Sequence, residues 1–278
     1  MSTDADAPTI LATAELTYQD YLRVPDLLSL QVPRSDPPAH DEMLFIIIHQ
    51  AFELWFKQML HEMESALASM ERDRILRAQH HLARVVKIMR LLVQQVGIIE
   101  TMATAEFLLF RDRLNPASGF QSIQFREIEY LAGVKDARYL EVFKNRPEFR
   151  EVLARRLEGP DLSDTFQRLM LRHASDLPAG SHDYPGHEDP HQDALMKALL
   201  KLYEHPDSNL RLYLLSESLV ELDEAMAQWR YTHVLMVERV IGFRRGTGGS
   251  SGVRYLESTL SKRCFPYLWE VRTYLQKL

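Results

Sequence analysis

Cysteine is nearly absent from this 278-residue sequence, which contains only Cys264. A single cysteine excludes a disulfide framework within the chain and a CxxC pair for zinc, and it is typical of a reducing compartment. Glycine is scarce, and strand-like alternation is almost missing. No apolar run approaches the roughly 20 residues that cross a bilayer, and the acidic start MSTDADAPTI is unlike a signal peptide. We therefore expect a cytoplasmic, all-α protein that does not enter a membrane.

Positive charge is not in excess either, because the net charge is -6 and acidic and basic residues are interspersed. This balance does not favour a nucleic-acid partner. With 46% hydrophobic residues the chain has ample material for a core. The sequence predicts a disordered N-terminus over residues 1–15 and one helical domain over residues 16–278.

Apolar residues recur at helical spacing almost throughout the chain. They predict long helices over residues 41–70, 72–98 and 208–243, of which the last is expected to be the longest. Thr104 is expected to cap a further helix, and Pro25 to interrupt short helices between residues 16 and 29. The predicted architecture is a helical bundle with a ligand pocket between its long helices.

The stretch QWRYTHVLMVERVIGFRRGTGGSSGV, residues 228–253, joins a helix to a loop rich in glycine. The helix carries His233 and the loop carries Thr247. Glycine allows a chain to wrap closely over a ligand, so the pattern suggests a cofactor beside His233 and a small polar ligand under the loop. A hydrogen-bonded structural histidine and a mobile connection are the alternative interpretations.

Two pairs of residues spaced four apart share helix faces: Phe45 with His49, and Phe107 with Arg111. A buried neutral His49 either accepts a hydrogen bond from a ligand or bonds to a backbone carbonyl or to Glu53. Arg111, set among leucines and phenylalanines, needs an anion. That anion is either a ligand carboxylate or a structural partner such as Asp112 or Asp41.

Other chemistry-bearing patterns are weaker. His182, His187 and His191 match no zinc-binding spacing and are interrupted by proline and glycine, so a solvated loop is favoured. Cys264 is expected to be a small buried residue. No GxSxG nucleophile elbow is present, and no strand precedes a GxGxxG motif.

Four motifs in order resemble one family, tryptophan 2,3-dioxygenase. They are LTYQDYL (16–22), HDEMLFIIIHQAFELWFK (40–57), FRDRLNPASGFQS (110–122) and the stretch 228–253. Together they extend the resemblance from about residue 16 to residue 273. The resemblance implies an all-helical homotetramer with one non-covalent haem b per subunit. It also implies insertion of O2 across the C2–C3 bond of the L-tryptophan indole to give N-formyl-L-kynurenine, the first step of tryptophan catabolism by the kynurenine route.

At the matching positions, the resemblance makes His233 the axial ligand of the haem iron. It places Phe45 and His49 in the substrate pocket, with His49 facing the indole N–H and orienting the substrate. It assigns the substrate carboxylate to Arg111 and the ammonium group to Thr247.

The resemblance further implies that Tyr18, Tyr21 and Leu22 reach into the site of a neighbouring subunit. Phe107 departs from the tyrosine found in relatives, so it keeps an apolar wall against the substrate and loses a hydroxyl contact. Two other hypotheses stay open at this point: a haem-binding sensor or carrier on the same scaffold, and a structural bundle without a cofactor.

Overall fold

The computed structural model describes residues 16–179, 184–244, 246–248 and 251–275, and every regular element within these ranges is helical. The α-helices are α1 (Tyr18–Leu22), α2 (Val24–Leu28), α3 (His40–Glu71), α4 (Ile75–Ile99), α5 (Thr104–Arg111), α6 (Ile123–Leu131), α7 (Tyr139–Val142), α8 (Pro147–Glu158), α9 (Leu162–Arg172), α10 (Pro190–Glu204), α11 (Leu210–Ile241), α12 (Val253–Glu257) and α13 (Pro266–Tyr274). Short 3-10 turns lie at Asp112–Leu114, Gly119–Gln121, Ala174–Asp176 and Pro206–Asn209. The predicted all-α fold is confirmed. The expectation for residues 1–15 lies outside the described residues.

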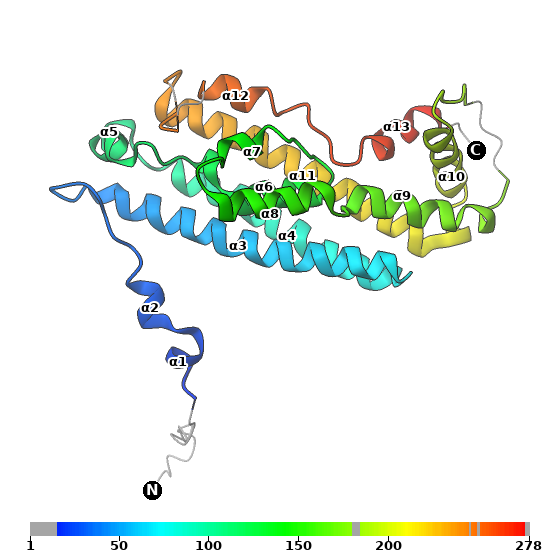
Figure 1. Ribbon diagram of the computed structural model, residues 1–278, viewed down its shortest axis with the longest axis horizontal. Coiled ribbons are helices and arrows are strands. Elements are labelled where there is room, and N and C mark those ends of the chain that lie inside the picture. Colours follow the sequence, from blue (N-terminus) through cyan, green and yellow to red (C-terminus); the bar gives the residue numbers. More distant parts are fainter. Residues whose placement is uncertain (1–15, 180–183, 245, 249–250, 276–278) are drawn as a thin grey trace, which may run out of the picture.

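Three long helices, α3, α4 and α11, form the spine of the molecule (Figure 1). Helix α4 packs along both α3 and α11. It does so because its buried apolar side chains recur three and four residues apart, at Leu82, Val85, Met89, Leu92 and Val96. Helix α11 carries the same spacing at Leu212, Leu215, Leu219, Leu222 and Met226. As a result, α3 and α11 each pack against α4, which fixes the positions of both helices.

The ends of α11 follow from local chemistry. The Asn209 side chain accepts a hydrogen bond from the Leu212 N–H at 3.2 Å and so caps the start of the helix. Gly242, with φ at 60°, ends it in a backbone conformation that favours glycine. The helix has 32 residues, about 48 Å at 1.5 Å per residue. It was expected to be the longest helix, but α3 has the same 32 residues.

Two predicted boundaries are wrong in detail. Thr104 is the first residue of α5, and Ala103 holds the capping position without a side-chain hydrogen bond. Residues 16–29 do form two short helices, but the break falls at Arg23, whose φ is 51°. Pro25 lies in the first turn of α2, where its missing N–H has no helical partner to lose.

The N-terminal helices α1 and α2 project away from the body of the molecule (Figure 1). Neither contains a buried residue. By contrast, helices α3, α4, α5, α6, α9, α10, α11 and α13 contribute residues to one core cluster, and α7 and α8 contribute to a second, smaller one. Within that body, α5, α6, α12 and the loops that adjoin them contribute residues to a cavity beside the spine.

Candidate active site

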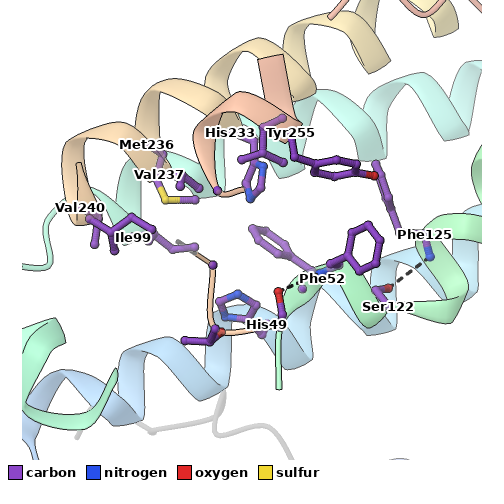
Figure 2. Close-up of a pocket in the computed structure, with 18 of the residues that line it drawn as sticks. His49, Phe52, Ile99, Ser122, Phe125, His233, Met236, Val237, Val240 and Tyr255 are labelled. Atoms are coloured by element: carbon purple, nitrogen blue, oxygen red, sulfur yellow. Dashed lines mark hydrogen bonds between the residues drawn. The ribbon is translucent and has the colours of Figure 1, made fainter. Parts of the chain in front are cut away.

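A cavity of about 260 Å³ lies between the N-terminal half of α3 and the C-terminal half of α11. Its walls are mostly apolar, as in pockets that enclose small molecules. Figure 2 shows His233 and His49 on opposite sides of the cavity, each ring pointing into it. Ile99, Val237 and Val240 lie at one end.

His233 enters the cavity from α11. Its ring stacks on that of Trp229, one helical turn earlier, with 5.7 Å between centroids and an interplanar angle of 11°. Burial, aided by the positive charge of Arg126 and by His49, lowers the pKa of His233 to about 4. The ring borders the cavity and is only partly covered by protein atoms. His233 is therefore neutral at pH 7 and presents a lone pair.

His49 enters from α3 with a defined tautomer. Its Nδ1 lies 2.7 Å from the Phe45 carbonyl oxygen, one turn back on the same helix. Because a carbonyl only accepts, Nδ1 must carry the proton, and Nε2 is left as a hydrogen-bond acceptor. Burial lowers the pKa of His49, against the opposing effects of that hydrogen bond and of Glu53. Of the structural partners considered for His49, the backbone carbonyl is the one that bonds to the ring.

An aromatic wall stands beside His49. The Phe45 ring lies 4.1 Å from the His49 ring, 5.8 Å from the Phe107 ring and 5.6 Å from the Phe110 ring, centroid to centroid. Phe107 and Phe110 meet edge to face at 5.2 Å. Such pairs are favourable beyond the area they bury and hold the rings in place. The wall is rigid and apolar, and Phe107 brings no hydroxyl to it.

Arg111, the last residue of α5, also lines the cavity. Its side chain is 16% exposed, and its Nη1 lies 3.6 Å from an oxygen of Asp112, whose side chain is 88% exposed. Of the two acidic partners expected for Arg111, Asp112 is beside it, whereas Asp41 pairs with His40 at 2.9 Å. An ion pair with so exposed a carboxylate is weak, because solvent screens it.

The glycine-rich loop closes over the cavity through described residues on its inner side. The Thr247 hydroxyl donates to the Ala117 carbonyl oxygen at 2.6 Å. A Cβ atom at Gly248 would come within 2.6 Å of the Ser118 Cβ, so this close approach requires glycine. Gly252, with φ at 67°, likewise leaves no room for a side chain against the Arg244 carbonyl. The loop therefore docks on residues 116–118, and Thr247 faces the cavity.

The structure brings six of the nine predicted residues to one cavity, five of them being Phe45, His49, Arg111, His233 and Thr247. Phe107 lines it as well. The other three, Tyr18, Tyr21 and Leu22, lie on α1 with exposed fractions of 71%, 73% and 43%, and do not line the cavity of their own chain.

Sequence reasoning missed several residues of the cavity, namely Phe52, Phe125, Arg126, Glu129, Trp229, Arg230 and Tyr255. Trp229 and Arg230 could have been found, because they lie four and three residues before His233 on one helix face. Arg126 and Glu129 gave no signal, since an i,i+3 ion pair on a helix is usually solvated. Only the packing of α6 against the spine buries them.

The remaining candidates stay apart from the cavity. His191 contacts Gln167 and His187 contacts the backbone of Asp189, while His182 lies outside the described residues. Within the ranges described, no three His, Cys, Asp or Glu side chains gather as a metal site would require. Cys264 is buried, as predicted.

Comparison with known proteins supplies an independent finding. The chain matches the family model described as Tryptophan 2,3-dioxygenase over residues 3–186 and 185–275. A protein of that name from Nocardioides sp. is 48% identical over 268 residues, covering 94% of this chain and 96% of its own length. Proteins of the same name from Caulobacter vibrioides (44% identical; 94% of this chain, 99% of the relative) and Myxococcus xanthus (42%; 93% and 89%) are also similar.

No helix among the described residues combines the length and the apolar character needed to cross a membrane.

The docking of the glycine-rich loop generates one prediction. Gly248→Ala should separate the loop from Ser118 and break the Thr247–Ala117 hydrogen bond, which stabilises docking by about 1 kcal/mol. Hydrogen exchange in peptides containing Thr247 should then quicken roughly fivefold. Gly119→Ala is the matched control, because a Cβ there meets no atom within 4 Å. Equal exchange in both variants would contradict the assigned contact.

Proposed function

The chain belongs to the tryptophan 2,3-dioxygenase family, and we propose that the cavity between α3 and α11 is where it carries out the reaction of that family. The chain is an enzyme that inserts both atoms of O2 across the C2–C3 bond of the L-tryptophan indole, giving N-formyl-L-kynurenine. The relatives are named as enzymes, and they align with nearly the whole chain. A non-catalytic sensor or carrier is therefore not supported.

Haem b is the cofactor that this activity implies, and the cavity has the chemistry to hold it. His233 offers a neutral imidazole, the form that binds iron, and no residue in the described ranges hydrogen-bonds to its ring. Apolar side chains of Ile99, Met236 and Val240 suit the flat face and edge of a porphyrin. We propose His233 as the axial ligand. Bound haem supplies the oxygen chemistry, and the protein supplies position and electrostatics.

The side of the cavity opposite His233 matches L-tryptophan group by group. Phe45 and Phe107 form a wall for the indole ring. The Nε2 acceptor of His49 suits the indole N–H, which is the one donor on that ring. Arg111 can hold the carboxylate with its guanidinium fork. The Thr247 hydroxyl donates its hydrogen bond to the Ala117 carbonyl, so its oxygen can accept a hydrogen bond from the ammonium group.

His49 orients the indole in this arrangement. A ring whose pKa is lowered by burial holds a proton weakly, so it is better suited to accept a hydrogen bond than to remove a proton outright. Fixing the indole N–H at Nε2 would set the orientation of the C2–C3 bond within the cavity. The apolar wall and the docked loop exclude water from that space.

The observation that carries this proposal is the pair of neutral histidines from different helices, pointing at each other across one apolar cavity. A structural bundle without a ligand would pack such a space with side chains.

We also propose that residues 16–278 form one domain and that the chain assembles as a homotetramer. Helices α1 and α2 bury no residue of their own and expose Tyr18, Tyr21 and Leu22. Exposed aromatic and aliphatic side chains on a projecting segment are typical of a contact surface. The proposal places these three residues against the cavity of a neighbouring subunit.

Replacing Tyr18 and Tyr21 together by serine should weaken this assembly. Sedimentation velocity should show dissociation at concentrations where the unchanged protein is a tetramer, with a raised KM for tryptophan. Leu76→Ser on α4 is the control, since Leu76 is likewise an exposed hydrophobic side chain, with an exposed fraction of 54%. A tetramer of undiminished stability would contradict docking by α1.

His233→Ala should abolish stoichiometric haem binding, because the variant loses the lone pair that would bind the iron. Absorption of the reconstituted protein measures this directly. His80→Ala removes an exposed histidine from α4 and should leave the haem content unchanged. Full haem content with an unchanged spectrum in His233→Ala would refute the assigned ligand.

Arg111→Met should raise the KM for L-tryptophan roughly 30-fold or more, because losing one partner of a desolvated charge pair costs about 2–5 kcal/mol. Binding of tryptamine, which has no carboxylate, should be much less affected. Arg113→Met, an exposed arginine two residues further on, is the control. An unchanged KM for L-tryptophan would refute the carboxylate contact.

A further inference from the structure

A buried cluster of charges forms part of the cavity wall, and nothing in the proposed substrate contacts uses it. It consists of Arg126 and Glu129 on α6 and Arg230 on α11, which are 7%, 2% and 5% exposed. All three line the cavity. Tyr139 and Tyr255 complete the cluster, because the Arg126 Nη1 donates to the Tyr139 hydroxyl at 2.5 Å and the two tyrosine hydroxyls hydrogen-bond to each other.

Positive charge is in excess around the cavity. Within the buried cluster, the two guanidinium groups of Arg126 and Arg230 face the single carboxylate of Glu129. Glu129 serves both buried arginines, at 2.7 Å from the Arg126 Nη1 and 3.3 Å from the Arg230 Nη2. Tyr139 brings no negative charge, since burial raises its pKa further above neutral pH. An excess cation in a low-dielectric site is costly unless an anion joins it.

Other acidic groups nearby are already engaged. Glu53 accepts from the Gln124 side chain at 2.7 Å. Asp223, two turns before Arg230 on α11, is buried and accepts from the backbone N–H groups of Cys264 and Phe265 and from the Trp269 ring N–H. Neither carboxylate is hydrogen-bonded to Arg126.

Most hydrogen-bond donors of Arg126 have no acceptor among the described residues. A guanidinium has five N–H groups, and in Arg126 only Nη1 has a hydrogen-bond partner among the described residues. Its Nε is buried without any acceptor, and the contact from Nη1 to the Glu129 Oε2 is an ion pair without hydrogen-bond geometry. The rings of Phe125 and Tyr139 flank the guanidinium at 4.9 and 4.5 Å and hold it in place.

The polarity of the cavity indicates what the missing anion belongs to. Figure 2 shows Tyr255 of this cluster, with Phe125, on the side of the cavity away from Ile99 and Val240. One end is therefore aliphatic and the other cationic. A flat molecule with an apolar edge and a carboxylate-bearing edge matches this arrangement, and haem b has that distribution.

We propose that Arg126, supported by Glu129, Tyr139 and Arg230, binds a propionate carboxylate of the haem. The proposal rests on the proposed function, which places haem in this cavity. The cofactor is a better match than the substrate, because the charge of Arg126 acts on His233, the proposed axial ligand, and the proposed function assigns the amino-acid carboxylate to Arg111. Tyr255 belongs to α12, which follows the glycine-rich loop, so the same contact ties that loop to the cofactor.

The test compares two probes, haem b and its dimethyl ester, in which both carboxylates are blocked. Each is titrated into the apoprotein, and its transfer rate to an excess of apomyoglobin is measured. The unchanged protein should bind haem roughly 10- to 100-fold more tightly than the ester, the range expected for one charge-assisted hydrogen bond. Arg126→Met should lose that preference by weakening the binding of haem and leaving that of the ester nearly unchanged.

Arg156→Met is the matched control, because Arg156 is a partly buried arginine that pairs with Glu64 and Glu127, and none of these three residues lines the cavity. It should retain the full preference for haem. Arg126→Lys keeps the charge without the planar fork and should retain part of that preference.

Several results would overturn the proposal. Equal weakening of haem and ester by Arg126→Met would show a structural role. A raised KM for tryptophan with unchanged haem binding would assign Arg126 to the substrate carboxylate. If Arg126→Met does not fold, equal affinity of the unchanged protein for haem and ester is the overturning result. Failure of the unchanged protein to bind either probe would overturn the proposed function as well, which separates the two cases.

Discussion

The structure depends on the way α4 packs along both α3 and α11. Its apolar side chains at spacings of three and four fill the space between the two outer helices over most of their length. Along the N-terminal half of α3, large aromatic side chains such as Phe52 and Trp229 meet at 5.2 Å instead, and a cavity remains beside them. The two histidines face that cavity, and the same apolar surroundings keep them neutral. Helix packing thus sets both the geometry and the protonation state of the site.

Electrostatics divides the cavity into regions with different tasks. Neutral imidazoles occupy its two faces, aliphatic side chains one end, and a buried guanidinium cluster the other. Arg111 and the glycine-rich loop stand at a further position, where an amino acid can be held by both of its charged groups. The proposed arrangement thus assigns the carboxylates of cofactor and substrate to separate cations, Arg126 and Arg111.

Much of this arrangement could be predicted from the sequence, and the reasons are local. Helical spacing over α3, α4 and α11 is strong because each helix buries a continuous apolar stripe, and motifs around His49, Arg111 and His233 pointed to residues that now share one cavity. The burial of Arg126 and Glu129 could not be predicted, since their spacing on α6 is equally typical of a solvated face. The N-cap position of α5 at Ala103 and the break between α1 and α2 at Arg23 depend on backbone angles that side-chain identity does not fix.

An absorption spectrum of the reduced, haem-reconstituted protein under anaerobic conditions tests the central claim most directly. It is recorded before and after L-tryptophan is added, and again after air is admitted. The account predicts a histidine-ligated haem band that shifts on addition of L-tryptophan, followed by the absorbance of N-formyl-L-kynurenine once oxygen enters. A haem band that ignores L-tryptophan, with no product in air, would contradict the placement of cofactor and substrate on opposite sides of one cavity.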